Sequence, residues 1–89
     1  MDRVDMASYG RHAWNQIRGI SVEKLMRALR ADGWAEEKRR SGTRPFYKDG
    51  ARIVIHYHPG KTFGPKILRG ILQSIGWSEA DLKRLKLIK

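Results

Sequence analysis

Two stretches of the chain repeat apolar residues at the spacing of an α-helix. In the first, Val22, Leu25, Met26 and Leu29 recur at intervals of three, four and seven residues, which places them on one buried face. Ser21 is a favourable N-cap residue, and Gly33 follows the last apolar position. This pattern predicts a helix over residues 22–31. Its solvent-facing side carries Lys24, Arg27 and Arg30.

The second amphipathic stretch spans residues 65–75. Its predicted apolar face comprises Ile67, Leu68, Ile71, Leu72 and Ile75. Pro65 suits a first helical position, where its missing N–H would have no intrahelical partner, and Gly76 is the expected end. Gly70 costs roughly 1 kcal/mol against alanine inside a helix, so we expect it to allow close packing against a strand; the alternative is contact with a partner.

Extended segments are predicted between these two helices, near residues 34–40, 44–48 and 52–57. Ile53, Val54 and Ile55 are β-branched, and Asp49-Gly50 between two extended runs is typical of a tight hairpin turn. Trp34 is expected to lie in the core. After the second helix, Ser78 with Asp81 three residues later predicts the start of a short helix over residues 79–86.

This order of elements predicts an α+β domain of the form α-β-β-β-α with a short C-terminal helix. Local connections favour a three-stranded antiparallel sheet with both main helices on one face. We expect residues 20–89 to form a single domain. Residues 1–19 form an N-terminal extension, either a short helical turn through Trp14 and Ile17 that caps the core or a partly disordered segment.

The charge narrows the choice of partners. The chain of 89 residues has 19 Lys and Arg against 9 Asp and Glu, a formal net charge of +10. This balance indicates a polyanionic partner, which could be nucleic acid, an acidic protein or an anionic membrane surface. There is no cysteine, no long apolar run and no signal-peptide pattern, so we expect a cytoplasmic protein without a membrane segment. We expect neither a metal nor another cofactor.

The most specific motif is His-Pro-Gly-Lys at residues 58–61, followed by Gly-Pro-x-x-Leu-Arg-x-Ile-Leu at residues 64–72. Together with the Gly-Trp pair that ends the first helix, these residues resemble the HicA toxin family over about residues 20–77. The resemblance implies a fold like that of a double-stranded-RNA-binding domain, cleavage of mRNA by a metal-independent endoribonuclease, and neutralisation by a HicB-like antitoxin.

One family motif is changed in this chain. The family carries Gly-Ser-His just before its second strand, with the histidine regarded as catalytic, whereas this chain reads Ser41-Gly42-Thr43-Arg44-Pro45. An ungapped comparison puts Thr43 at the histidine position, and matching Gly42 to the motif glycine puts Arg44 there. Neither side chain serves as a general acid or base near neutral pH.

The remaining catalytic candidates are His58, beside Lys61 in the turn, and His56, two residues earlier on the strand. An extended chain would direct both histidines to the same face of the sheet. The candidate RNA-binding residues are Arg39, Arg40, Thr43, Arg44, Lys61, Lys66 and Arg69. The alternative is a non-catalytic RNA-binding or protein-interaction module on the same fold. A DNA-binding accessory protein is a third interpretation, which the absence of a recognition-helix pattern disfavours.

Overall fold

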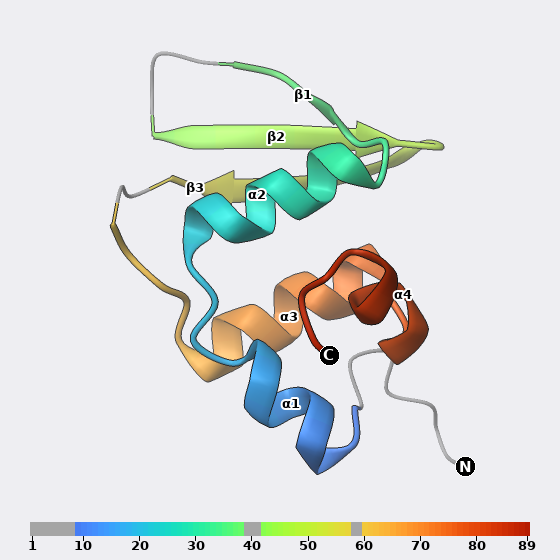
Figure 1. Cartoon of the computed structure of the whole chain (residues 1–89). Helices are drawn as coiled ribbons and strands as arrows, with labels where there is room; N and C mark the ends of the chain where they lie inside the picture. Colours follow the sequence, from blue (N-terminus) through green and yellow to red (C-terminus); the bar gives the residue numbers. More distant parts are fainter. Residues whose placement is uncertain (1–8, 39–41, 58–59) are drawn as a thin grey trace, which may run out of the picture. The chain divides into compact units, whose positions relative to one another are not determined.

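A computed structural model of the chain describes residues 9–38, 42–57 and 60–89 (Figure 1). The elements are α1 (Arg11–Ile17), α2 (Val22–Ala31), β1 (Ala35–Glu36), β2 (Thr43–Lys48), β3 (Ala51–His56), α3 (Pro65–Ile75) and α4 (Glu79–Arg84). They form two compact units. One unit, residues 20–62, contains α2 and the sheet, and the other combines residues 1–19 with residues 63–89 and contains the other three helices.

The sheet has three antiparallel strands in the order β1-β2-β3, as predicted. β2 and β3 form a hairpin in which Lys48 pairs with Ala51, so the connection has two residues. Both of these, Asp49 and Gly50, have positive φ angles of 49° and 82°. This backbone matches the twist of a two-residue hairpin, and Asp-Gly adopts it readily, which confirms the predicted turn.

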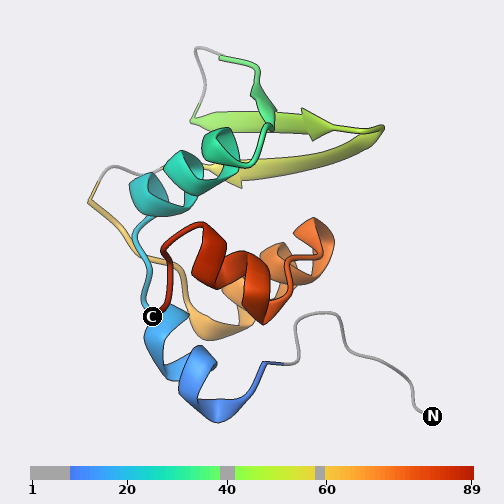
Figure 2. The same cartoon turned by 45° about the vertical axis from the view of Figure 1, so that its right-hand side comes forward.

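Helix α2 has the predicted bounds and lies across one face of the sheet (Figures 1 and 2). The Ser21 hydroxyl accepts a hydrogen bond from the backbone N–H of Lys24 at 3.1 Å, which satisfies one of the free donors of the first turn. The helix contributes the fully buried Leu25 and Leu29 to the core of this unit. Trp34 is also buried, as expected.

The prediction of a first strand over residues 34–40 was too long. Only Ala35 and Glu36 belong to β1, Glu37 and Lys38 lie beyond its end, and residues 39–40 lie outside the described residues. The Glu37 N–H donates to the carbonyl of Pro45 at 2.9 Å, but Pro45 has no N–H to donate in return. The ladder therefore ends where the proline of β2 comes opposite the first strand.

Helix α3 also has the predicted bounds, and Gly76 ends it with a left-handed φ of 82°. Leu68 and Leu72, four residues apart, are fully buried. Ile67, however, is 63% exposed, so its assignment to the apolar face was wrong. Gly70 shares the exposed side with Ile67, and a Cβ added to it would meet nothing within 4 Å. The expectation that Gly70 allows close packing was therefore also wrong.

Within the described part of the N-terminal segment, from residue 9 onward, the structure shows a helix, α1, whose Ala13 and Ile17 are buried. The Tyr9 hydroxyl donates to the carbonyl of Trp77 at 2.9 Å, and the Gly10 N–H donates to the Glu79 carboxylate at 2.6 Å. These contacts fasten the start of the described chain to the start of α4.

Helix α4 begins with the predicted capping box, in which Ser78 and Asp81 each accept a hydrogen bond from the other's backbone N–H. It ends at Arg84, two residues earlier than predicted, and Lys86 takes a positive φ of 62°.

The chain is thus an α+β protein in which α2, the three strands and α3 follow one another as predicted. That α3 shares a face of the sheet with α2 stays a prediction. None of the helices within the described residues is long and apolar enough to cross a membrane.

Candidate nucleic-acid interface

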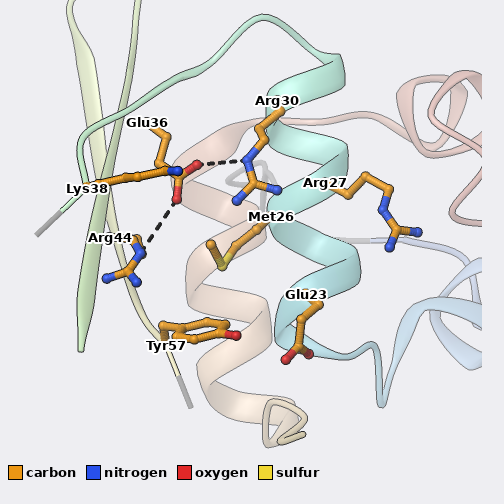
Figure 3. Close-up of a pocket in the computed structure, with 8 residues that line it drawn as sticks. All are labelled: Glu23, Met26, Arg27, Arg30, Glu36, Lys38, Arg44 and Tyr57. Carbon is orange, nitrogen blue, oxygen red and sulfur yellow. Dashed lines mark hydrogen bonds and ion pairs between the residues drawn. The ribbon is translucent and has the colours of Figure 1, made fainter. Parts of the chain in front are cut away.

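A cationic pocket of about 370 Å³ lies between α2 and the sheet (Figure 3). Helix α2 lines it with Glu23, Met26, Arg27 and Arg30. The strand side lines it with Glu36, Lys38, Arg44 and Tyr57. Four cationic and two anionic side chains give the lining a formal charge of +2. A concave site of this charge is suited to an anionic ligand.

Glu36 is held between two of these arginines. Its Oε1 accepts a hydrogen bond from Nε of Arg30 at 2.8 Å, and its Oε2 lies 3.6 Å from Nε of Arg44. The hydrogen bond from Arg30 is the main cause that lowers the pKa of Glu36, and the same bond raises the pKa of Arg30. Glu36 therefore stays ionised and fixes the positions of both guanidinium groups.

Arg44 is also positioned by an aromatic ring. Its guanidinium carbon lies 5.2 Å from the centroid of the Tyr57 ring, within the range of a cation–π interaction. Its Nη1 donates a hydrogen bond to the carbonyl of Thr43 at 3.2 Å. With Glu36 on Nε, the Arg44 side chain is oriented from several sides, and 22% of its surface remains exposed.

The opposite face of the sheet carries a different set of residues. Directly paired residues of an antiparallel ladder point to the same face, so Thr43 shares a face with His56, its partner on β3. Tyr47 and Arg52 are also partners on this face, with the Arg52 guanidinium 5.9 Å from the Tyr47 ring. Arg44 pairs with the buried Ile55 and points instead to the side covered by α2.

The end of the His-Pro-Gly-Lys motif is attached to the start of α2. The Gly60 N–H donates to Oε2 of Glu23 at 3.1 Å, and the carbonyl of Lys61 accepts from the Val22 N–H at 3.1 Å. The exposed Lys61 side chain therefore lies at the N-terminal turn of α2. His58, the first residue of the motif, lies outside the described residues.

Lys66 and Arg69 belong to α3, in the other unit, and both are exposed. The Arg69 guanidinium lies 4.5 Å from the centroid of a Trp14 ring on α1. This contact gives Arg69 a structural role between two helices in addition to its predicted one.

The structure thus brings some of the predicted site residues together and separates others. Arg44 and Lys61 both belong to the sheet unit, Arg44 within the pocket and Lys61 at the start of α2. Thr43 and His56 lie on the other face of the sheet, and Lys66 and Arg69 lie in the other unit. Arg39 and Arg40, like His58, lie outside the described residues.

Sequence reasoning did not identify several of the pocket residues, among them Arg30, Glu36, Lys38 and Tyr57. The alternation that places Ile53 and Ile55 in the core also directs Tyr57 toward α2, so the strand pattern could have identified it. The contact of Glu36 with Arg44 depends on the register of β1 against β2, for which the sequence has no comparable signal.

Comparisons with known proteins place the chain in a family. Neither the curated proteins nor the solved structures contain a match to it. The family model described as the HicA toxin of bacterial toxin-antitoxin systems matches residues 22–77, more than half of the chain. That range includes α2, the whole sheet, the cationic pocket and α3. The chain therefore belongs to the HicA toxin family of bacterial toxin–antitoxin systems, and this membership implies a cognate antitoxin as its partner.

Proposed function

We propose that this toxin binds mRNA in the cytoplasm and cleaves it as a metal-independent endoribonuclease, and that a HicB-like antitoxin neutralises it. The observation that carries the proposal is the pairing of His56 with Thr43 across β2 and β3. Thr43 is one of the two positions that correspond to the family's catalytic histidine. Side chains of directly paired residues have Cβ atoms about 5 Å apart. His56 can therefore supply an imidazole close to the position where the family motif has one.

Cleavage of RNA without a metal needs a base that takes the proton of the 2′-hydroxyl and an acid that protonates the leaving 5′-oxygen. The 2′-oxygen then attacks the phosphorus, the bond to the 5′-oxygen breaks, and a cyclic phosphate remains on one product. We assign the acid and base roles to His58 and His56, because histidine titrates near neutral pH. Lys61, close in sequence to both, would stabilise the charge of the phosphorane.

RNA binding is supported by the positive charge of the chain and by the placement of Arg44 in the cationic pocket. Contacts to phosphate need only cations and hydrogen-bond donors at suitable spacing. Lys66 and Arg69 on α3 extend the proposed RNA-binding residues to the other unit. Thr43, with a hydroxyl on the face of His56, would contact the ribose or the phosphate beside the cleaved bond.

A second candidate function is a binding module without cleavage. The residues at both positions that correspond to the family's histidine, Thr43 and Arg44, favour it, because neither exchanges a proton near neutral pH. In this second function the proposed RNA-binding residues are the same, but His56 and His58 have no catalytic role.

The deciding experiment incubates the purified full-length chain and three variants with mixed RNA in the presence of a chelator. We expect His58→Gln and His56→Gln each to lower the cleavage rate by at least about 100-fold, the lower end of general acid–base catalysis, with little change in RNA affinity. His12→Gln is the matched control, because His12 is exposed on α1 and is the third histidine of the chain.

Two outcomes would contradict parts of the proposal. If the unmutated protein cleaves no RNA above a blank but still binds it, the binding-module function replaces the enzyme. If both glutamine variants cleave as fast as the unmutated protein, the protein is a nuclease whose catalytic residues lie elsewhere.

A further inference from the structure

We infer that the pocket between α2 and the sheet binds one nucleotide of single-stranded RNA, with its base against Tyr57 and Arg44 and its phosphate near Lys38. The inference rests on the proposed RNA binding and specifies the form of RNA that this surface takes. Its volume of about 370 Å³ lies within the range of small-molecule sites, roughly 300–1,000 Å³.

The cations of the pocket differ in how far they are already neutralised. Arg30 and Arg44 both contact the Glu36 carboxylate, so part of their charge is balanced within the protein. Lys38 acts on Glu36 only through its charge, as one of the lesser causes that lower the pKa of that carboxylate, and both Lys38 and Arg27 are exposed. Figure 3 shows Lys38 on the strand side of the pocket and Arg27 pointing to the far side of α2, so Lys38 is the side chain suited to contact the phosphate of the bound nucleotide.

The pocket also has a less polar part, which would make no contact with a small anion such as a free phosphate. Met26, buried to all but 4% of its surface, projects from α2 toward the strands, and the Tyr57 ring lies below it (Figure 3). A nucleobase gains stacking energy on aromatic rings and on guanidinium planes, and methionine adapts to flat ligands. The combination of Tyr57, Arg44 and Met26 therefore favours a base over an acidic peptide side chain, which would use the cations alone.

A pocket of this kind selects single strands. The bases of an RNA duplex are stacked on their neighbours, and an A-form helix presents phosphates and 2′-hydroxyls rather than base faces. A duplex can contact Lys38 at the rim, but it cannot place a base on Tyr57 without unpairing it. Binding of single-stranded RNA should thus depend on Tyr57, whereas binding of a duplex should not.

The experiment measures the affinity of the full-length chain for short 2′-O-methyl RNA, which cannot be cleaved through its 2′-oxygen, by fluorescence anisotropy. Three probes of equal length are compared: a single strand, the same strand without bases, and a duplex. Base stacking on an aromatic side chain contributes roughly 1–3 kcal/mol, so we expect Tyr57→Leu to weaken single-strand binding about 5- to 150-fold. The abasic strand and the duplex should bind this variant as they bind the unmutated protein.

Tyr47→Leu is the matched control, because Tyr47 also has an arginine over its ring but lies on the opposite face of the sheet. It should bind all three probes like the unmutated protein. Tyr57→Phe keeps the ring and should keep the affinity for the single strand. Lys38→Glu, which changes only the charged rim, should weaken binding of the intact and the abasic strand alike.

The results separate this inference from the proposed function. If the unmutated protein binds none of the probes, both fail. If it binds RNA but prefers the intact strand no more than the abasic one, or if Tyr57→Leu binds the single strand as tightly as Tyr47→Leu, only the nucleotide pocket is overturned. If Tyr57→Phe loses as much affinity as Tyr57→Leu, Tyr57 acts through its hydroxyl and stacking is excluded.

Discussion

Arg30 of α2 and Glu36 of β1 are joined by a hydrogen bond of 2.8 Å between Nε and Oε1, and this bond links the helix to the edge of the sheet. The Glu36 side chain is only 10% exposed, so its carboxylate is partly shielded from solvent. Because of this hydrogen bond, the stability of the sheet unit depends on the ionisation of Glu36.

The first prediction is that Glu36→Gln lowers the free energy of unfolding by about 1 kcal/mol at neutral pH, because the amide keeps a hydrogen-bond acceptor but loses the charge. The pKa of Glu36 is lower in the folded protein than its ordinary value of 4.5. The ionised carboxylate therefore stabilises the fold above the unfolded pKa, and this contribution is lost as the pH falls through the folded pKa.

Urea unfolding between about pH 7 and about pH 3 should show a smaller loss of stability for Glu36→Gln than for the unmutated protein. Asp81, whose pKa is also lowered, mainly by the hydrogen bond from the Ser78 backbone, should keep its own acid dependence in both proteins. Asp49→Asn, in the exposed hairpin turn, is the control for removing one negative charge. Parallel pH profiles for Glu36→Gln and the unmutated protein would contradict the prediction.

The second prediction concerns two glycines of α3 whose replacement should have opposite effects. Gly70 is inside the helix and has open space where a Cβ would lie, so Gly70→Ala should raise the free energy of unfolding by about 0.5–1 kcal/mol. Gly76 has a φ of 82° at the end of the helix, so Gly76→Ala should lower it by roughly 1–2 kcal/mol. Thermal and urea unfolding of both variants check this.

A destabilised Gly70→Ala would show that the glycine is needed for packing after all. If Gly70→Ala is more stable but no longer bound by its antitoxin, the exposed side of α3 belongs to the interface with that partner.

The sequence predicted those parts of the fold that are determined by residues within the same segment of the chain. Ser21 and Gly76 mark the ends of helices through their own backbone preferences, and Asp49-Gly50 determines its turn in the same way, so these boundaries were predicted closely. β1 was predicted too long because its end depends on Pro45, a residue of the neighbouring strand. Ile67 was misassigned because helical spacing alone does not show how wide the buried face is.

The candidate site was predicted less completely than the fold. Arg44 and Lys61 were identified because they lie in or beside family motifs. The contact of Arg30 with Glu36 forms between a helix and a strand, and no local pattern predicts it. The separation of Thr43 and Arg44 onto opposite faces of the sheet follows from the alternation of β2 once its first residue is known.

The third prediction is that Tyr9 ionises only at strongly alkaline pH. Burial is the main cause that raises the pKa of Tyr9 to about 12, and the nearby carboxylates of Asp81 and Glu79 add to it. The chain has three tyrosines, so Tyr9→Phe should remove one phenol from the ultraviolet absorbance titration, and the lost absorbance change should lie near pH 12. A titration curve of the same shape in this variant would contradict the assignment.

The same shift has a consequence for stability. Because the pKa of Tyr9 is raised above its ordinary value of 10.0, the neutral phenol stabilises the fold below that pH, and this contribution is lost as the pH rises toward the folded pKa. Tyr9→Phe also removes the hydrogen bond to the Trp77 carbonyl, so it should lower the free energy of unfolding by about 1 kcal/mol at neutral pH.

The fourth prediction is that RNA binding depends steeply on salt. If about five phosphates are neutralised, the slope of log affinity against log salt for a single strand should be roughly −3 to −4, because each contact contributes about −0.7. The Lys61→Glu/Arg69→Glu double variant should weaken binding to single-stranded and double-stranded RNA alike and reduce this slope. Both side chains are exposed and offer positive charge to RNA phosphates.

Two controls separate the loss of phosphate contacts from damage to the fold. Lys24→Glu/Lys83→Glu makes the same change of net charge at exposed helical positions outside the proposed RNA-binding residues, and it should bind more tightly than the Lys61→Glu/Arg69→Glu variant. Because Arg69 lies over Trp14, Arg69→Gln combined with a measurement of unfolding shows how much of its effect is structural. A flat salt profile would mean that RNA binding does not depend on phosphate contacts. Equal binding by the two charge-reversal variants would mean that the positive charge of this chain acts only as a whole and that Lys61 and Arg69 do not contact RNA phosphates.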